Sequence, residues 1–377
     1  MKKLFLLSVL ILSLGIKQSH AQTVPKPEHV IIVIDENHAY SQIIGSSSAP
    51  YINSLVSDTD AALFTSSYAL RHPSQPNYLC LYSGSDQGIS SSDAISTSTP
   101  FTSCNLGASL IGASYTFIGY SEDLPSTGSL VTTSGSYARK HNPWSNWQGT
   151  GSNQIPSTDN QPWTSFPTAY ANLPTVSFVI PNLDDDMHSA SVSAGDTWLQ
   201  TNLDPLIQWV KKNNSLLILT WDEDDDSHGN HIATLFIGQN VKGGSYAEHI
   251  THYNVLKTVE TMYGLSGCDS DITATAITDI WRPKVSEVSN ISSVTDVSIY
   301  PSPAKENLNV YIKSDLANKA TLCITDMTGR ELKKEDIAIK EGENNFNVNI
   351  ENFTTGMYLL RLSGEGINYC NKVVVNK

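Results

Sequence analysis

The chain has 377 residues and a formal net charge of −14, and a length of this order predicts two domains rather than one. Most of the negative charge lies in residues 22–290, where 26 Asp and Glu face 10 Lys and Arg, whereas residues 291–377 are close to neutral. Such an acidic first part would repel a phosphate backbone, which argues against a nonspecific nucleic-acid partner. It suits a cation-binding protein, although a solvated acidic surface explains the same charge.

The first 21 residues have the pattern of an export signal. Lys2 and Lys3 precede an apolar run over residues 4–16, and the tripeptide at 19–21 (Ser-His-Ala) offers a small-x-small cleavage site. The run is shorter than the roughly 20 residues that a bilayer-spanning helix requires. No other segment is long and apolar enough to span, so we expect an exported mature protein without a transmembrane segment.

Residues 22–283 alternate strand and helix patterns, which predicts an α/β domain with a central sheet flanked by helices. We expect helices over residues 195–212 and 252–265. The first four expected strands stop at clusters of polar, mostly acidic side chains. Because the carboxyl ends of strands line the ligand crevice in open α/β sheets, we expect these clusters to share one site. The expected strands are residues 29–34, 115–120, 175–180, 216–220 and 233–237.

The rest of the chain predicts a second, smaller domain. Residues 284–296 are rich in Ser, Val and Asn and are typical of a linker. Beyond them, short alternating strands separated by Asn, Gly and Lys turns predict a small all-β sandwich over residues 297–377. No group of His, Asp or Glu there has ligand spacing, so we expect no chemistry in it. Its expected strands are residues 297–300, 308–312, 320–325, 345–350, 357–362 and 372–375.

The five cysteines form no Cys-x-x-Cys pair. An oxidising compartment permits a disulfide, and an odd number leaves at least one thiol unpaired. Their spacing leaves the connectivity open. The residues are Cys80, Cys104, Cys268, Cys323 and Cys370.

The segment 71–77 (Arg-His-Pro-Ser-Gln-Pro-Asn) is the first candidate for chemistry. Pro76 suits the first turn of a helix that begins just after Ser74. The Ser74 hydroxyl would then lie beside unsatisfied backbone N–H groups, a favourable place for a phosphate, and Asn77 would donate to a phosphoryl oxygen. On this motif alone, a serine that only caps the helix explains the pattern equally well.

A serine hydroxyl needs activation before it attacks, and no Gly-x-Ser-x-Gly motif surrounds Ser74. Coordination to a metal lowers the pKa of a hydroxyl and neutralises phosphoryl charge. Glu36 and Asn37 at one strand end, with Asp222 and Glu223 at another, would supply four oxygen ligands, and Ser74 a fifth. We expect one divalent cation, with Mg²⁺, Ca²⁺ or Mn²⁺ favoured over Zn²⁺ by the oxygen-rich set.

The acidic run at 222–226 has a competing interpretation as a calcium loop. An EF-hand requires glycine at the sixth position and glutamate at the twelfth, where this chain has Ser227 and Ala233. We therefore expect Asp224 and Asp226 to belong to a solvated loop.

Histidines are the remaining candidates, because residues 22–290 contain few Lys and Arg to bind phosphate or to protonate a leaving oxygen. His188 follows an expected core strand, His231 lies shortly after the acidic run, and His141 precedes Asn-Pro-Trp. A solvent-facing loop histidine is the alternative for each. His249 and His252 are weaker candidates, since His252 opens an expected helix and would serve as its cap.

Taken together and in this order, these segments resemble the bacterial phosphoesterase family that contains acid phosphatases and phospholipase C enzymes. That family belongs to the alkaline-phosphatase-like superfamily, and the resemblance runs from about residue 29 to residue 265. Each landmark alone is weak, but their number and order are specific. The landmarks are residues 29–38, 72–78, 120–125, 181–188, 195–199, 220–223 and 230–231.

The resemblance implies an alkaline-phosphatase-like sheet and a role for each matching residue. Ser74 corresponds to the nucleophile, which would attack phosphorus and form a phosphoserine that water hydrolyses. Glu36 and Asn37 correspond to one metal-binding pair, and Asp222 and Glu223 to the other.

Further residues are candidates for contact with the substrate. His188 and His231 look like the family's phosphate-binding histidines. Glu122, His141 and Asn142 are further candidates to line the substrate.

One departure from the superfamily bears on the number of metals. Two-metal members have an Asp-His pair where this chain has Asp222 and Glu223. A second metal would need Asp184, His188 and another histidine, so a single metal site fits these residues better.

Residues 297–377 resemble the C-terminal sorting domain of the type IX secretion system. The resemblance rests on residues 299–304, 324–330, 355–361 and 372–377. It implies passage to the periplasm, interaction with the type IX machinery and release from the cell or attachment to its surface.

Three functions remain open. The leading hypothesis is a metal-dependent phosphomonoesterase acting on a phosphorylated small molecule or lipid. A phosphodiesterase or phospholipase C would share the same core, although the acidic surface argues mildly against association with anionic membranes. A surface-displayed binding protein without catalysis is the alternative of another class, but a binding module has no need of Ser74 beside a complete ligand set.

Overall fold

The computed structural model describes residues 24–282, 294–315, 317–364 and 367–377. The chain divides into two compact units, residues 1–283 and residues 284–377. The expected export signal at residues 1–21 lies outside the described residues, as does the expected linker up to residue 293. Residues 294–296, which we expected in the linker, instead open a strand of the second unit.

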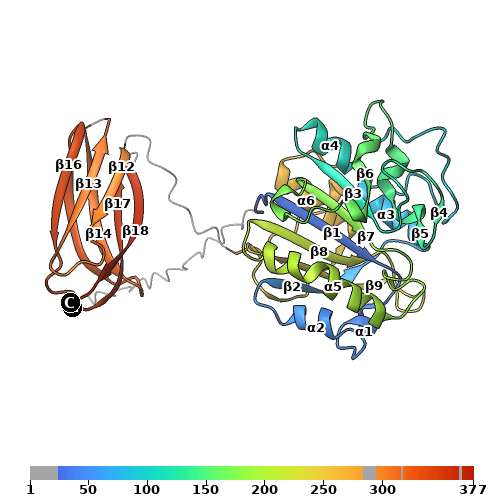
Figure 1. Cartoon of the computed structure of the whole chain (residues 1–377), viewed down its shortest axis with the longest axis horizontal. Helices are drawn as coiled ribbons and strands as arrows, with labels where there is room; N and C mark the ends of the chain where they lie inside the picture. Colours follow the sequence, from blue (N-terminus) through green and yellow to red (C-terminus); the bar gives the residue numbers. More distant parts are fainter. Residues whose placement is uncertain (1–23, 283–293, 316, 365–366) are drawn as a thin grey trace, which may run out of the picture. The chain divides into compact units, whose positions relative to one another are not determined.

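The first unit is built on a nine-stranded, mostly parallel sheet with helices on both faces (Figure 1). The strand order is β10-β2-β9-β8-β1-β7-β3-β6, and β11 also pairs with β2. β1 is parallel to both of its neighbours, β7 and β8, whereas β9 is antiparallel to β8 and to β2. The strands are β1 (His29–Asp35), β2 (Ala61–Tyr68), β3 (Phe117–Ser121), β6 (Asn160–Pro162), β7 (Val176–Ile180), β8 (Ser215–Trp221), β9 (His231–Gly238), β10 (Gly244–Tyr246) and β11 (Ile250–Thr251).

Alternation along β1 divides the core of this unit into two layers. Val30, Ile32 and Ile34 face the layer that contains α3, α4 and α6, whereas Ile31 and Val33 face the layer that contains α1, α2 and α5. All five side chains are buried, because a central parallel strand is covered on both faces. The helices are α1 (Tyr40–Ile43), α2 (Pro50–Val56), α3 (Ser74–Ser83), α4 (Leu106–Gly112), α5 (Val192–Val210) and α6 (His252–Tyr263).

The predicted α/β class is confirmed, and the five expected strands and two expected helices are present with shifted ends. β2 was not predicted from the sequence. It pairs with β9 along one side and with β10 and β11 along the other. Its sequence places Thr65, Ser66 and Ser67 after a short apolar run and so lacks the continuous pattern of the other central strands. The structure accommodates these polar residues where the pairing register with β9 shifts, between Phe64 and Ser67.

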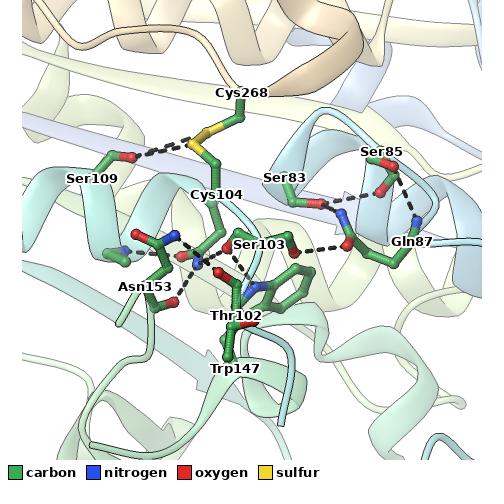
Figure 2. The surroundings of a disulfide bond; sticks show 12 residues. Ser83, Ser85, Gln87, Thr102, Ser103, Cys104, Ser109, Trp147, Asn153 and Cys268 are labelled. Atoms are coloured by element: carbon green, nitrogen blue, oxygen red, sulfur yellow. Dashed lines mark hydrogen bonds between the residues drawn. A yellow bond between two sulfur atoms is a disulfide. The ribbon is translucent and has the colours of Figure 1, made fainter. Parts of the chain in front are cut away.

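A disulfide between Cys104 and Cys268 joins the segment before α4 to the segment after α6 (Figure 2). The Ser109 hydroxyl lies beside both sulfur atoms, at 3.8 Å and 4.0 Å. Next to the disulfide, the Ser103 carbonyl accepts a hydrogen bond from the Trp147 indole. Figure 2 shows the disulfide joining the segment of Cys104 to that of Cys268. Of the other cysteines, Cys80 is buried and free, and Cys323 and Cys370 of the second unit are also free.

The second unit is all-β, as predicted. A three-stranded sheet (β12-β13-β16) and a four-stranded sheet (β15-β14-β17-β18) enclose one apolar core. β15 was not predicted, because most of its residues are charged or polar and only its last part is apolar. Charged residues are common in edge strands. The strands are β12 (Val294–Tyr300), β13 (Asn307–Ser314), β14 (Asn318–Asp326), β15 (Glu331–Ile339), β16 (Gly342–Asn349), β17 (Gly356–Gly364) and β18 (Ile367–Val375).

Within the described parts of the chain, no helix combines the length and the apolar character that crossing a membrane requires.

Candidate active site

Two neighbouring strands deliver acidic side chains to the same edge of the sheet. β1 ends at Asp35 and is followed by Glu36, while β8 ends at Trp221 and is followed by Asp222. The strands are parallel and in a register that sets Asp35 beside Trp221, so the residues after them emerge together. The Asn37 N–H donates to Asp222 Oδ1 at 3.2 Å and ties the two strand ends.

Ser74 lies against this edge as the first residue of α3, with Pro73 as the N-cap. The helix therefore begins at Ser74 rather than just after it. The side chain does not cap the helix, because its hydroxyl lies 3.2 Å from Glu36 Oε2 and 3.0 Å from Glu223 Oε1. Ser74 is only 3% exposed, so these carboxylates are the immediate surroundings of its oxygen.

Three buried carboxylates converge on the Ser74 hydroxyl: Glu36, Asp222 and Glu223. Burial, together with the charges of Glu36 and Glu223, raises the pKa of Asp222 well above its usual range, and burial raises the pKa of Glu223 to about 7. Asp222 Oδ2 is buried and has no hydrogen-bond partner among the described residues. Oxygen donors in this number, with one buried oxygen unpaired, fit a hard divalent cation.

Glu36 is held from its other side by Tyr78 and His141. The Tyr78 hydroxyl donates to Glu36 Oε1 at 2.7 Å, and His141 Nε2 lies 2.9 Å from the same oxygen. Burial opposes both charges, but the pairing lowers the pKa of Glu36 to about 2 and raises the pKa of His141 to about 9. Glu36, His141 and Asp186 are close enough to share a metal ion.

His72 contacts the opposite side of the cluster, where sequence reasoning named no partner. Its Nδ1 lies 2.9 Å from Glu223 Oε2 and 3.1 Å from Asp226 Oδ1, and its Nε2 lies 3.1 Å from Asp224 Oδ1. The expectation of a solvated loop is wrong for Asp224, which is 1% exposed and accepts from three backbone N–H groups of its own loop. Asp226 is exposed, as expected.

Asn77 lies beside Ser74, but its amide has other partners than the phosphoryl oxygen we expected. Its Oδ1 accepts from the N–H groups of Leu70 and Arg71, and its Nδ2 donates to the Arg71 carbonyl at 2.8 Å. The remaining Nδ2 hydrogen faces Glu223 Oε2 at 3.4 Å. Asn77 therefore fixes the loop that leads into Ser74 and has no free donor for a phosphate in this arrangement.

His188 lies on the Glu36 side of the site. Its ring centroid is 5.9 Å from that of His141, and its Nε2 is 3.5 Å from Lys140 Nζ. Burial and the neighbouring cations lower the pKa of His188, while the charge of Glu36 opposes this shift. The structure therefore brings His188 close to the carboxylate cluster, and its contact with phosphate stays a prediction.

His231 begins β9 and has its described contacts elsewhere. Its ring stacks between Tyr40 and Tyr68, with centroid separations of 4.6 Å and 4.9 Å. Its Nε2 lies 3.1 Å from the Thr65 carbonyl oxygen. These contacts direct the imidazole at the backbone of β2, and contact of His231 with phosphate stays a prediction.

Glu122 and Asn142, two of the three further candidates to line the substrate, are engaged in holding loops. Glu122 accepts from the Asn182 N–H and from the Trp198 indole, and burial raises its pKa to about 7. Asn142 is fully buried and accepts from the Ser121 hydroxyl at 2.6 Å. Both side chains fix the segments that carry His188 and His141.

His252 is a buried support beneath the site and not the helix cap we expected. Thr251 and Asn254 form the cap of α6, while His252 Nε2 lies 3.0 Å from the Trp221 carbonyl oxygen, next to Asp222. Burial lowers the pKa of His252 to about 4, so the imidazole is neutral and donates from Nε2.

Sequence reasoning missed Tyr78, His72 and Asp186 as parts of this site. A signal existed for Tyr78, because it follows Ser74 by one helical turn and so shares its face of α3. His72 and Asp186 reach the cluster from loops, and neither spacing nor pattern places a loop side chain. His141 was named, but for the substrate rather than for Glu36.

Comparisons with known proteins match one family model to each of the two units. The phosphoesterase family model matches residues 46–266, and the model of the secretion system C-terminal sorting domain matches residues 298–376. A phosphatidylinositol-3-phosphatase of Mycobacterium tuberculosis (strain ATCC 25618 / H37Rv) is 46% identical over 263 residues, which cover 69% of this chain and 85% of that protein.

More distant relatives cover less of their own length. A phosphate-repressible acid phosphatase of Penicillium chrysogenum is 26% identical over 221 residues, which are 55% of this chain and 53% of that protein. Among solved structures, an alkaline phosphatase superfamily protein from Vibrio parahaemolyticus matches with a TM-score of 0.48 at 12% identity, over 78% of this chain and 79% of that one.

Proposed function

The chain belongs to the phosphoesterase family and is a hydrolase of phosphate esters, and on this premise we propose that it is a metal-dependent phosphomonoesterase with Ser74 as its nucleophile. The observation that carries the proposal is the Ser74 hydroxyl, buried between two carboxylates at 3.0 Å and 3.2 Å. A serine with only a structural role has no need of such neighbours.

In this proposal Glu36, Asn37, Asp222 and Glu223 hold one divalent cation together with Ser74. When bound, the cation would lower the pKa of the hydroxyl and offset the charge of the phosphoryl oxygens. Tyr78 and His141 orient Glu36, and His72 and Asn77 orient Glu223, as partners of metal ligands commonly do.

The reaction begins with the proton on Ser74 Oγ directed at Glu223 Oε1 and Glu36 Oε2. As this proton leaves to solvent, Oγ attacks phosphorus, the bond from phosphorus to the ester oxygen breaks, and the departing oxygen takes up a proton from solvent, so the step uses and releases one proton. We assign His188 to bind the phosphoryl oxygens. Water then attacks the phosphoserine, which returns free Ser74 and inorganic phosphate.

Replacing the nucleophile tests the assignment. We expect Ser74→Ala to lower kcat on a chromogenic phosphomonoester by at least roughly 10³-fold while the protein stays folded. Ser83→Ala is the matched control, because Ser83 ends the same helix and bonds to the backbone away from the carboxylates. Turnover by Ser74→Ala within tenfold of the wild type would refute the assignment.

Metal dependence has a separate test. Dialysis against a chelator should abolish turnover, and adding back Mg²⁺, Ca²⁺, Mn²⁺ or Zn²⁺ one at a time should identify the cation. Full activity in metal-free buffer, with no metal found by elemental analysis, would remove the cation from the mechanism.

We further propose that the protein is exported and then carried by type IX secretion to the cell surface or the medium. The match of residues 298–376 to a secretion sorting domain supports this route. Deleting residues 297–377 should leave the enzyme inside the cell envelope, as measured by phosphatase activity in cell fractions. Unchanged activity in the medium or at the surface would contradict the route.

A further inference from the structure

Lys140 and His188 form a basic pair beside the carboxylate cluster. Their nitrogen atoms are 3.5 Å apart, and the neighbouring His141 lies 2.9 Å from Glu36. Both side chains remain accessible to solvent, in contrast to the buried carboxylates. The site therefore has a basic side at Lys140 and His188, opposite the acidic loop that holds His72.

The backbone on both sides of this pair is fixed. Arg139, His141 and Asn142 are all buried and hydrogen-bonded, so Lys140 projects from a segment anchored before and after it. His188 is fixed through its N–H, which donates to Asp186 Oδ1 at 2.8 Å. The two nitrogens are thus presented by preorganised backbone rather than by mobile loops.

Lys140 lies in an acidic part of the chain, yet its partner is a basic group. Residues 22–290 carry 26 acidic residues and only 10 Lys and Arg. Of these cations, Arg71, Lys211 and Arg282 pair with carboxylates, Lys211 with Asp58 at 2.5 Å. Of the described residues, none offers Lys140 a carboxylate in an ion pair, and its described side-chain contact is with another basic group. Lys140 Nζ donates one of its three hydrogens to His188 Nε2, and the other two have no described acceptor and are suited to an anion.

We propose that Lys140, together with His188, binds the non-bridging oxygen that a phosphomonoester has and a diester lacks, and that Lys140 thereby selects monoesters. This inference rests on the proposed function, since it places the phosphoryl group between Ser74 and the basic pair. A monoester dianion offers a charged third oxygen to Lys140 Nζ. In a diester that position carries an alkoxy group. Its oxygen accepts hydrogen bonds only weakly, and its substituent would lie against Lys140 and His188.

The test compares kcat/KM on p-nitrophenyl phosphate with kcat/KM on bis(p-nitrophenyl) phosphate for the full chain. Lys140→Gln removes the charge at similar length, and we expect the monoester-to-diester ratio to fall roughly 10- to 100-fold, the size of one charge-assisted hydrogen bond. Lys140→Arg should restore most of the ratio. Lys257→Gln on α6 is the control and should leave the ratio unchanged.

A purely structural role for Lys140 would lower both activities together, so an unchanged ratio in Lys140→Gln overturns the inference whatever the absolute rates. Titration of inorganic phosphate into metal-loaded wild type and Lys140→Gln provides a second readout that needs no turnover. We expect about tenfold weaker phosphate binding in the variant, and equal affinity overturns the inference. If the wild type hydrolyses neither ester, the proposed function fails instead, and the phosphate titration still decides the role of Lys140.

Discussion

Replacing Tyr78 by Phe would test how the protein holds Glu36 for a cation. The change removes one oxygen, which donates to Glu36 Oε1 at 2.7 Å, and both residues are almost completely buried. No water replaces the lost donor easily at such a site, so the carboxylate keeps only His141, at 2.9 Å, on that oxygen. The variant should fold, because the ring still packs on His141 at a centroid separation of 5.0 Å.

The size of the effect follows from the lost hydrogen bond. A hydrogen bond to a charged group contributes about 1.5–3 kcal/mol, and 1.4 kcal/mol corresponds to a tenfold change in an equilibrium constant. Since His141 still holds Glu36, we expect the lower part of this range, which gives a roughly 10- to 30-fold weaker affinity for the activating cation. At saturating metal, kcat should recover to within a few-fold of the wild type.

Activity measured against free metal concentration in a metal-buffered solution gives this affinity directly. Tyr82→Phe is the matched control, because Tyr82 lies two turns from Ser74 on the same helix and is equally buried in the aromatic core. Its loss of a hydroxyl should leave the metal dependence unchanged. A wild-type metal dependence in Tyr78→Phe, or an equal shift in both variants, would refute the role assigned to Tyr78.

Two further predictions concern stability. Reducing the Cys104–Cys268 disulfide, which spans 164 residues, should lower the unfolding free energy of the first unit by up to about 5 kcal/mol, because the unfolded chain gains conformational entropy. Urea denaturation with and without reductant measures this change. An unchanged midpoint would contradict the prediction. His252 should make stability fall in acid, because its pKa is lowered from 6.5 to about 4 and the unfolded chain takes up a proton first. The contribution of neutral His252 to stability is complete above pH 6.5 and is lost as the pH falls through about 4, a change of about 3 kcal/mol. The variant His252→Gln should lack this change. Parallel curves of stability against pH for the two proteins over this range would count against the prediction.

Much of the fold and part of the site could be predicted from local pattern. The continuous apolar run before Asp35 and the similar run before Asp222 identified buried strands, and the residues after them had to emerge at one edge of a parallel sheet. The polar residues in β2 and the charged residues in β15 concealed two strands, because their pairing is set by neighbouring strands rather than by their own sequence.

The sequence by itself determined which chemical groups the site has: Ser74 with a hydroxyl, and carboxylates at Glu36, Asp222 and Glu223. Only the tertiary structure decided their partners. It turned Asn77 toward the backbone, stacked His231 between Tyr40 and Tyr68, and set His141 against Glu36. The reason is that residue type and spacing follow from the chain locally, whereas the direction of a side chain depends on its contacts in the folded chain. For His231 and His141 these contacts are with Thr65 and Glu36, more than a hundred residues away.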